Sequence, residues 1–204
     1  MKWSLLLLFA SVVFAGDGSR LFYSRAFPGS TPAYFDLTVE SNGDTVYREA
    51  VDDELPSKFH LADAESKEVF ALADKLDHFK HPLESPLKVA FMGTKTFRFE
   101  EGAEKNEVKY NYSEDVNAQA LQEWFERMAE SAEHRDNVER AAKYDHLGLV
   151  QAMNLLASAY MRHRLVAVDQ FLPILDRVAK NENYMHTARA LAAEMAEAIR
   201  KAQP

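Results

Sequence analysis

The chain has 204 residues, a formal net charge of −8 at pH 7 and no cysteine. Without cysteine it forms no disulfide, carries no lipid on an N-terminal thiol and supports no thiol chemistry. The acidity repels a phosphate backbone, and no stripe of Lys and Arg interrupts it, so we expect no nucleic-acid partner. A chain of this length still buries a core that needs no covalent cross-links.

The first fifteen residues have the layout of a secretory signal peptide. One positive residue, Lys2, precedes an apolar or small run from Trp3 to Ala15, after which the sequence turns polar. Val13 and Ala15 fit cleavage after Ala15, and a run of about thirteen apolar residues is short for a membrane span. We expect residues 1–15 to be removed, which changes the net charge from −8 to −9 because Lys2 is lost. The mature protein is then expected to be secreted or periplasmic, with no transmembrane anchor.

Alternating side chains predict a β-hairpin near the start of the mature chain. Phe35, Leu37 and Val39 alternate with polar residues, the chain turns at Asn42-Gly43, and the alternation then resumes. Asn-Gly between two alternating runs is the strongest short-range hairpin signal, because a type I′ turn needs positive φ at both central residues.

A helix, a second hairpin and another helix follow. Apolar residues at helical spacing predict a helix that begins at Asp63 and lays one face on the sheet. Residues 97–112 alternate again around a turn, and the next helix opens on Ser113 or Asp115. Residues 16–130 therefore predict an α+β module, in which helices pack on an antiparallel sheet of two hairpins.

Residues 131–204 predict a small all-α helical bundle, because every periodicity in this part is helical. Pro173 is compatible with the middle helix if Asp169 is its N-cap, since the proline then lies in the first turn, where no amide bond is lost. No flexible linker separates the bundle from the α+β module, so one shared core and two separate cores both stay open. The positions at helical spacing are Leu149, Met153, Leu156 and Tyr160; Val168, Phe171, Leu172, Leu175 and Val178; and Tyr184, Ala188, Leu191, Met195 and Ala198.

The stretch "DHFKHPLES" raises the question of a metal site. His78 and His81 lie at i and i+3 on one helical face, and Glu84 could supply an oxygen ligand. Zinc helices of hydrolases instead use His at i and i+4 with a Glu between them, and Pro82 terminates this helix. We therefore favour a helix end at which the histidines meet exposed carbonyl groups, with metal binding by His78, His81 and Glu84 as the alternative.

No catalytic residue and no cofactor follow from local spacing. The stretch around Gly93 and Lys95 lacks the earlier glycine of a phosphate-binding loop, and no Gly-x-Ser-x-Gly elbow occurs. Neighbouring carboxylates do not supply the two facing groups of a glycosidase, so we interpret them as solvated surface.

Aromatic residues gather in the predicted sheet and fall on both of its faces. Such a sheet either buries both faces or shows one to a partner, and we favour the helical region as the cover of the second face. The alternative is a binding surface formed by four tyrosines, Tyr34, Tyr47, Tyr110 and Tyr112.

The segment from Arg25 to Glu49 resembles the start of a family of exported bacterial domains of unknown function. In those domains a Cys-Phe-Gly-x-Cys-Pro-x-Tyr segment enters a strand, and a Gly-containing turn leads to a second strand that ends near a Tyr. The two cysteines are absent here, with Ala26 and Thr31 near their places, and Pro28 is an extra residue. The resemblance implies a bacterial, exported α+β domain and carries no activity. The matching residues are Phe27, Gly29, Pro32, Tyr34, Gly43 and Tyr47.

These patterns favour an exported, non-enzymatic binding protein that contacts another protein or an envelope component. Local spacing assembles no nucleophile, base and oxyanion set, which is the reason for placing catalysis second. One alternative is a metal-assisted hydrolase that uses His78 and His81. Another is a protease-inhibitor-like domain whose contact is the loop from Lys80 to Thr94. The sequence does not indicate the oligomeric state.

Overall fold

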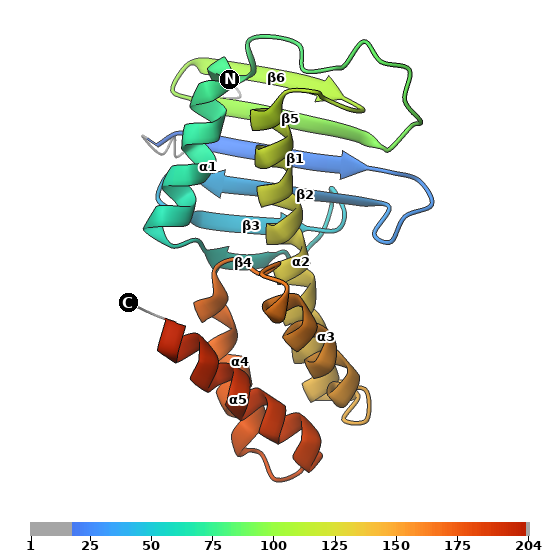
Figure 1. Ribbon diagram of the computed structural model, residues 1–204, viewed down its shortest axis with the longest axis vertical. Coiled ribbons are helices and arrows are strands. Elements are labelled where there is room, and N and C mark those ends of the chain that lie inside the picture. Colours follow the sequence, from blue (N-terminus) through green and yellow to red (C-terminus); the bar gives the residue numbers. More distant parts are fainter. Residues whose placement is uncertain (1–17, 203–204) are drawn as a thin grey trace, which may run out of the picture.

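The computed structural model describes residues 18–202 and shows a six-stranded antiparallel sheet with helices on one face and a helical bundle beyond one edge (Figure 1). The predicted α+β class is confirmed, as is a helical C-terminal region. The predicted signal peptide, residues 1–15, lies outside the described residues. None of the helices in residues 18–202 combines the length and the apolar character that crossing a bilayer requires.

The sheet has the strand order β4-β3-β2-β1-β5-β6, and all neighbouring strands are antiparallel. Two hairpins account for only part of it, because β1 lies in the centre between β2 and β5, and a short β4 extends one edge. Tyr23 of β1, for example, pairs with Leu37 on one side and with Phe97 on the other. The strands are β1 Arg20–Ala26, β2 Tyr34–Glu40, β3 Asp44–Arg48, β4 Ser57–His60, β5 Thr94–Glu101 and β6 Glu104–Tyr110.

The turn between β2 and β3 is not the predicted type I′ turn. Of its described residues 41–43, only Gly43 has a positive φ, of 94°, and its amide donates to the carbonyl of Glu40 at 2.8 Å. The turn is therefore a three-residue loop that ends on a left-handed glycine. A Cβ on Gly43 would lie 2.7 Å from the carbonyl oxygen of Leu61, so close packing also requires glycine here.

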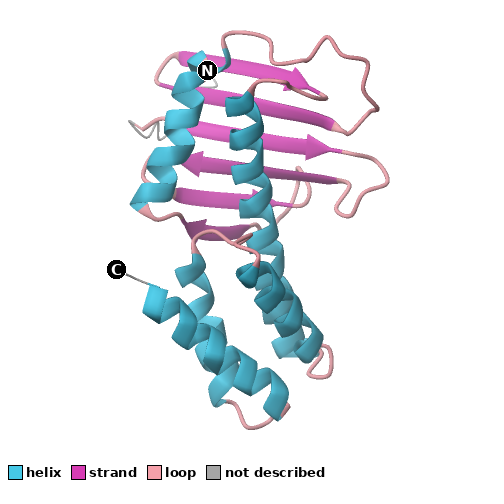
Figure 2. Ribbon diagram, viewed as in Figure 1, coloured by secondary structure: helices cyan, strands magenta, loops and turns pink. Residues whose placement is uncertain are grey.

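Two helices, α1 (Asp63–Lys75) and α2 (Val116–Tyr144), cover the same face of the sheet (Figure 2). As predicted, Asp115 caps α2, and its carboxylate accepts the amides of Asn117 and Ala118. The ring of Tyr23 stacks on Phe125 of α2, with centroids 5.0 Å apart. The core under the helices is therefore largely aromatic, and its rings include Tyr23, Phe35, Tyr47, Phe59, Phe79, Phe97, Phe99, Tyr110 and Phe125.

The helical region does not cover the second face of the sheet, which corrects that prediction. Because α2 starts directly after β6 and runs over the same face as α1, it carries the bundle past the edge strand β4 rather than behind the sheet (Figure 1). The second face holds ion pairs between neighbouring strands, with half-buried aromatic side chains such as Phe22 between them. These ion pairs include Arg20–Glu40 at 2.7 Å, Arg48–Asp36 at 3.0 Å and Arg98–Glu107 at 2.7 Å.

The bundle consists of α3 (Leu149–Met161), α4 (Leu172–Lys180), α5 (His186–Ala202) and the C-terminal part of α2. A 3-10 turn, η2 (Val168–Phe171), precedes α4, so α4 starts three residues after the predicted N-cap. Pro173 lies in the first turn of α4, where its missing amide costs no helical hydrogen bond.

A single helix, α2, joins the two regions, and the predicted boundary between residues 130 and 131 falls inside it. Its first half packs in the sheet core and its last turns pack in a second core within the bundle. The connection from α3 to α4 fastens this arrangement, because the amide of Val166 donates to the hydroxyl of Ser131 at 2.9 Å and the amide of Ala167 donates to Glu65 at 3.0 Å. The molecule therefore has two cores held together at one junction.

Candidate functional site

The three predicted metal ligands do not converge. His78 faces Asp74 at 2.8 Å, His81 faces Asp77 at 3.2 Å, and Glu84 accepts a backbone amide at the end of β6. Throughout residues 18–202, no group of three or more His, Cys, Asp or Glu side chains is placed to hold a metal ion. Nothing in this arrangement supports the hydrolase alternative.

The favoured helix-end interpretation of the histidines also needs correction. The helix α1 ends at Lys75, and residues 77–79 follow with positive φ. The ring of His78 stacks on Phe99 with centroids 3.8 Å apart. The two histidines therefore meet carboxylates and an aromatic ring, because the chain leaves the helix before it reaches them.

Two of the four tyrosines predicted to form a binding surface are buried beneath α2. Tyr47 is 2% exposed and donates to Glu133 at 3.0 Å, and Tyr110 is 3% exposed and donates to Gln122 at 3.3 Å. Burial raises the pKa of both hydroxyls far above its usual range, so both remain donors. These two residues hold α2 on the sheet and do not form a surface.

The other two tyrosines lie apart from them. Tyr34 is half-buried on the open face of the sheet and donates to Asp36 at 3.0 Å, and burial, followed by the charge of Asp36, raises its pKa to about 12. Tyr112 is half-buried beyond the end of β6. Because side chains alternate across a strand, the four tyrosines do not share one surface.

Several contacts hold the loop from Lys80 to Thr94 in place, and they include the amide of Ser85, which donates to the carbonyl of Tyr112 at 2.7 Å. Asn111 accepts the amide of Met92 at 2.6 Å and donates to the carbonyl of Ala90 at 3.1 Å. Phe91 nevertheless stays exposed. The inhibitor-like alternative for this loop stays a prediction.

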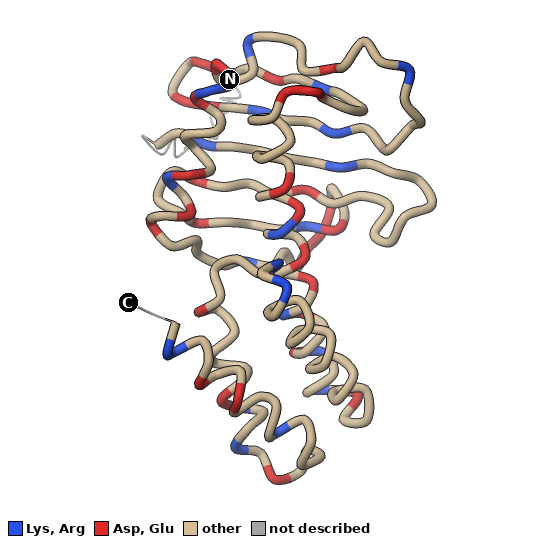
Figure 3. Tube along the Cα trace, in the orientation of Figure 1, with Lys and Arg blue, Asp and Glu red and all other residues tan. Residues whose placement is uncertain are grey.

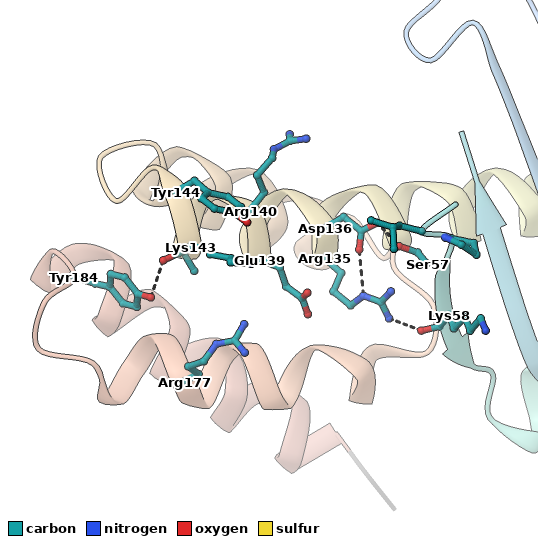
Figure 4. A pocket seen from close by; sticks show the side chains of 13 residues that line it. Ser57, Lys58, Arg135, Asp136, Glu139, Arg140, Lys143, Tyr144, Arg177 and Tyr184 are labelled. Carbon is teal, nitrogen blue, oxygen red and sulfur yellow. Dashed lines mark hydrogen bonds and ion pairs between the residues drawn. The ribbon is translucent and has the colours of Figure 1, made fainter. Parts of the chain in front are cut away.

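A cleft of about 690 Å³ opens where the sheet meets the bundle (Figure 4). Its walls are β4 with the end of the preceding loop, the last turns of α2, the end of α4 and the loop before α5. We call it the junction cleft, and it is lined by Leu55, Pro56, Ser57, Lys58, Arg135, Asp136, Glu139, Arg140, Ala142, Lys143, Tyr144, Arg177 and Tyr184.

The junction cleft is basic although the protein is acidic. Five of its lining residues are Lys or Arg and two are Asp or Glu, whereas the whole chain has a net charge of −8. Figure 3 shows that residues of both signs are spread over the sheet and the helices. A cleft of one sign between low-dielectric walls concentrates ions of the opposite sign.

One cation that points into the cleft, Arg177, is free to bind a ligand. Within residues 18–202, its side chain forms no ion pair and no hydrogen bond. Lys58 contributes its backbone to the cleft, because its side chain alternates with Ser57 and Phe59 on β4 and points away from α2 (Figure 4). Figure 4 shows Arg177 on α4 and Glu139 on α2 pointing into the cleft from opposite sides, while Arg140 turns outward. Glu139 reduces the positive charge without cancelling it.

Another cation, Arg135, builds the wall of the cleft. Its guanidinium donates to the carbonyl of Lys58 at 2.8 Å and to Gln170 at 3.0 Å, and it lies 3.5 Å from Asp136. Asp136 in turn accepts the hydroxyl of Ser57. Because β4 is an edge strand, the hydrogen bond from Arg135 to the carbonyl of Lys58 also occupies one of its outward carbonyl groups.

Apolar groups stand at both ends of the cleft. Leu55 is 89% exposed at the sheet end, and Tyr144 is 73% exposed at the far end, with the ammonium of Lys143 4.9 Å from the centre of its ring. Tyr184 is fixed, since its hydroxyl donates to the carbonyl of Ala142 at 2.8 Å. A ligand of the cleft therefore meets cations in the middle and apolar groups at the ends.

The lining suits the binding of an anion. Its one serine, Ser57, donates its hydroxyl to the carboxylate of Asp136, and no histidine is among its lining residues. The free guanidinium of Arg177 and the apolar surfaces can hold a carboxylate or a similar anion.

Of the residues that line this cleft, the sequence patterns singled out Tyr184 alone, as an apolar position of a predicted helix. Arg135, Glu139 and Lys143 follow one another at intervals of four and share a helix face, which is ordinarily a solvated charged face. Lys58 lies on a strand and Arg177 on a helix, and both are distant from α2 in the sequence. No local pattern therefore indicated that they approach α2.

No model of a known protein family matches the sequence, and no curated protein matches it. The resemblance of residues 25–49 to exported bacterial domains therefore stays a prediction.

Proposed function

We propose that this protein is an exported, non-enzymatic binding protein whose junction cleft holds an anionic group of its ligand. The observation that carries the proposal is a free cation, Arg177, that points into a cleft whose basic lining residues outnumber its acidic ones, in an acidic protein. Export rests on the sequence of residues 1–15 alone.

Unpaired charge in the cleft favours the binding of an anion. Many Lys and Arg side chains of the sheet, such as Arg20, Arg48 and Arg98, already face carboxylates. Arg177 gains a partner only from outside the described chain, so an anion adds a charge-assisted contact without breaking an existing one.

The proposal is tested by titrating the isotope-labelled protein with citrate, tripolyphosphate and hexaglutamate while amide chemical shifts are recorded. We expect at least one of these anions to shift the amides of Ser57, Lys58, Glu139 and Arg177. The variant Arg177→Ala should bind it about ten-fold more weakly, which corresponds to about 1.4 kcal/mol.

The matched control is Lys180→Ala, which removes an exposed cation of the same helix outside the cleft. It should leave the affinity nearly unchanged. Absence of any shift in the cleft with all three anions, or equal weakening by the control variant, contradicts the proposal.

A further inference from the structure

Seven consecutive residues in the loop before β5 are exposed, and six of them are apolar. Residues 86–92 read Pro-Leu-Lys-Val-Ala-Phe-Met. Leu87 is 54% exposed, Val89 39%, Phe91 58% and Met92 52%. Large apolar side chains rarely gather on the surface of a monomeric protein, and such a patch marks a contact with another molecule.

A second loop lies beside this one at the same end of the sheet. Ala26, the last residue of β1, pairs with Tyr34 of β2 and with Thr94 of β5, so the loop from β1 to β2 and the loop before β5 leave the sheet together. The rings of Phe27 and Phe91 meet edge to face, with centroids 6.0 Å apart. Figure 1 shows both loops reaching past the ends of the strands.

We call residues 27–32 and 86–92 the apolar tip, and its composition differs from that of the rest of the chain. Charged residues make up 27% of the sequence, but the apolar tip contains one, Lys88. Its other polar side chains are those of Ser30 and Thr31, and the hydroxyl of Ser30 already donates to backbone carbonyls of its own loop. A protein partner ordinarily meets a polar rim that offers hydrogen bonds. The apolar tip instead suits a fluid apolar partner that requires no directional contacts.

Backbone contacts at its base hold the apolar tip in shape. The side chain of Asn111 accepts the amide of Met92 at 2.6 Å and donates to the carbonyl of Ala90 at 3.1 Å. Gly93 has a φ of 91°, and a Cβ there would lie 2.8 Å from the Cβ of Phe27, so the two loops approach closely at this residue. A loop that is already ordered loses little conformational freedom on binding.

We propose that the apolar tip docks on the surface of a lipid bilayer. The side chains of Leu87, Val89, Phe91 and Met92 then leave water for the boundary between headgroups and acyl chains, and the apolar area that they bury drives the binding. The apolar tip shares no residue with the junction cleft, so this inference goes beyond the proposed function and does not depend on it.

The docking is shallow and depends little on the charge of the lipid. Irregular backbone does not enter hydrocarbon, because its unpaired N–H and C=O groups lose water there, so the loops stay at the headgroup boundary. Lys88 lays its stem along the apolar surface and keeps its ammonium among the headgroups. The net charge of −8 opposes attraction to an anionic membrane. Zwitterionic phosphatidylcholine is therefore expected to suffice.

Flotation with phosphatidylcholine vesicles tests the docking. The protein is prepared without residues 1–15, because the apolar run of that segment would bind lipid by itself. Both cores lie within residues 18–202, so the remaining chain keeps them. We expect half of the protein to float at a lipid concentration on the order of 1 mM, which is weaker than anchoring by one myristoyl chain. Adding phosphatidylglycerol to the vesicles should not strengthen the binding.

Two matched variants locate the contact. Leu87→Ser with Met92→Ser should weaken vesicle binding at least about ten-fold, because it removes two of the large apolar side chains of the tip. The control is Leu147→Ser with Met161→Ser, which removes the same two residue types from the bundle, where they are 80% and 72% exposed. It should bind vesicles as the unmodified chain does. All four side chains are exposed, so both variants should fold, which circular dichroism checks.

Three results overturn the bilayer as the partner: no flotation at about 10 mM lipid, equal weakening by the two variants, and binding that requires phosphatidylglycerol. If the unmodified chain instead self-associates without floating, and Leu87→Ser with Met92→Ser abolishes this association, a second copy covers the apolar tip and the bilayer is also overturned. Anion binding in the junction cleft is read from chemical shifts in the absence of lipid, so the two proposals fail separately.

Discussion

The two cores of the molecule are filled by different side chains. The sheet core contains nine aromatic rings, whereas the bundle core contains Phe171 and Tyr184 among aliphatic residues and alanines such as Ala188, Ala192 and Ala196. Large rings reach from a sheet to the helices above it, and small side chains let helices approach closely. The difference shows that each region packs by its own geometry, although one helix belongs to both.

The largest expected effect comes from the aromatic core. Phe125→Ala should lower the free energy of unfolding by about 3–5 kcal/mol, because it removes a buried ring stacked on Tyr23 and leaves a cavity. Urea denaturation measures the change. Phe91→Ala, in an exposed loop, is the control and should stay within about 0.5 kcal/mol. Equal losses for the two variants would show that the sheet core is not packed around this ring.

A smaller effect is expected at the junction between the cores. Ser131 is fully buried, accepts the amide of Val166 and donates to the carbonyl of Arg127. Ser131→Ala should cost about 1–3 kcal/mol, because it leaves the amide of Val166 without a partner.

The same variant sharpens the comparison of the cores. We expect tryptophan fluorescence, which reports α2 at Trp124, and helical circular dichroism to give one transition in the unmodified chain and to separate in Ser131→Ala. Gln151→Ala on the exposed face of α3 is the control. Coincident transitions in Ser131→Ala would mean that α2 alone couples the cores.

The smallest expected effect is a pH dependence at His134, also near the junction. Burial lowers its pKa, and the nearby Glu130, 3.8 Å away, only partly offsets this. A folded-state pKa below the unfolded value contributes stability that is present above the unfolded pKa and is lost as pH falls through the folded pKa. His134→Gln should therefore flatten the loss of stability as the pH falls below about 6.5, measured by urea denaturation. The control is His186→Gln, at an exposed histidine, which should leave the pH dependence of the free energy of unfolding unchanged. If both variants changed this pH dependence equally, His134 would not be the group that causes it.

Local patterns predicted the parts of the fold that depend on neighbours in the sequence. Phe35, Leu37 and Val39 alternate and do face the core, and Asp115 caps α2. The sequence patterns did not predict the central strand β1. One of its two partners, β5, is about seventy residues away in the chain, so no local turn signal links the two strands.

The candidate site was beyond the sequence for the same reason. Its lining comes from β4, α2, α4 and the loop before α5, and each segment alone reads as an ordinary charged surface. The signals that did stand out, His78 with His81 and the four tyrosines, were local. In the fold the two histidines meet different carboxylates, and two of the tyrosines, Tyr47 and Tyr110, are buried.

By itself, the sequence determined the α+β class, the helical C-terminal region and the acidity of the chain, because periodicity and composition are properties of the residues alone. Only the tertiary structure decided that both sheet-covering helices share one face, that α2 serves two cores, and that Glu139 and Arg177 point into one cleft from opposite sides. These depend on where a rigid helix leads the chain after it leaves the sheet, and packing between distant segments sets that direction.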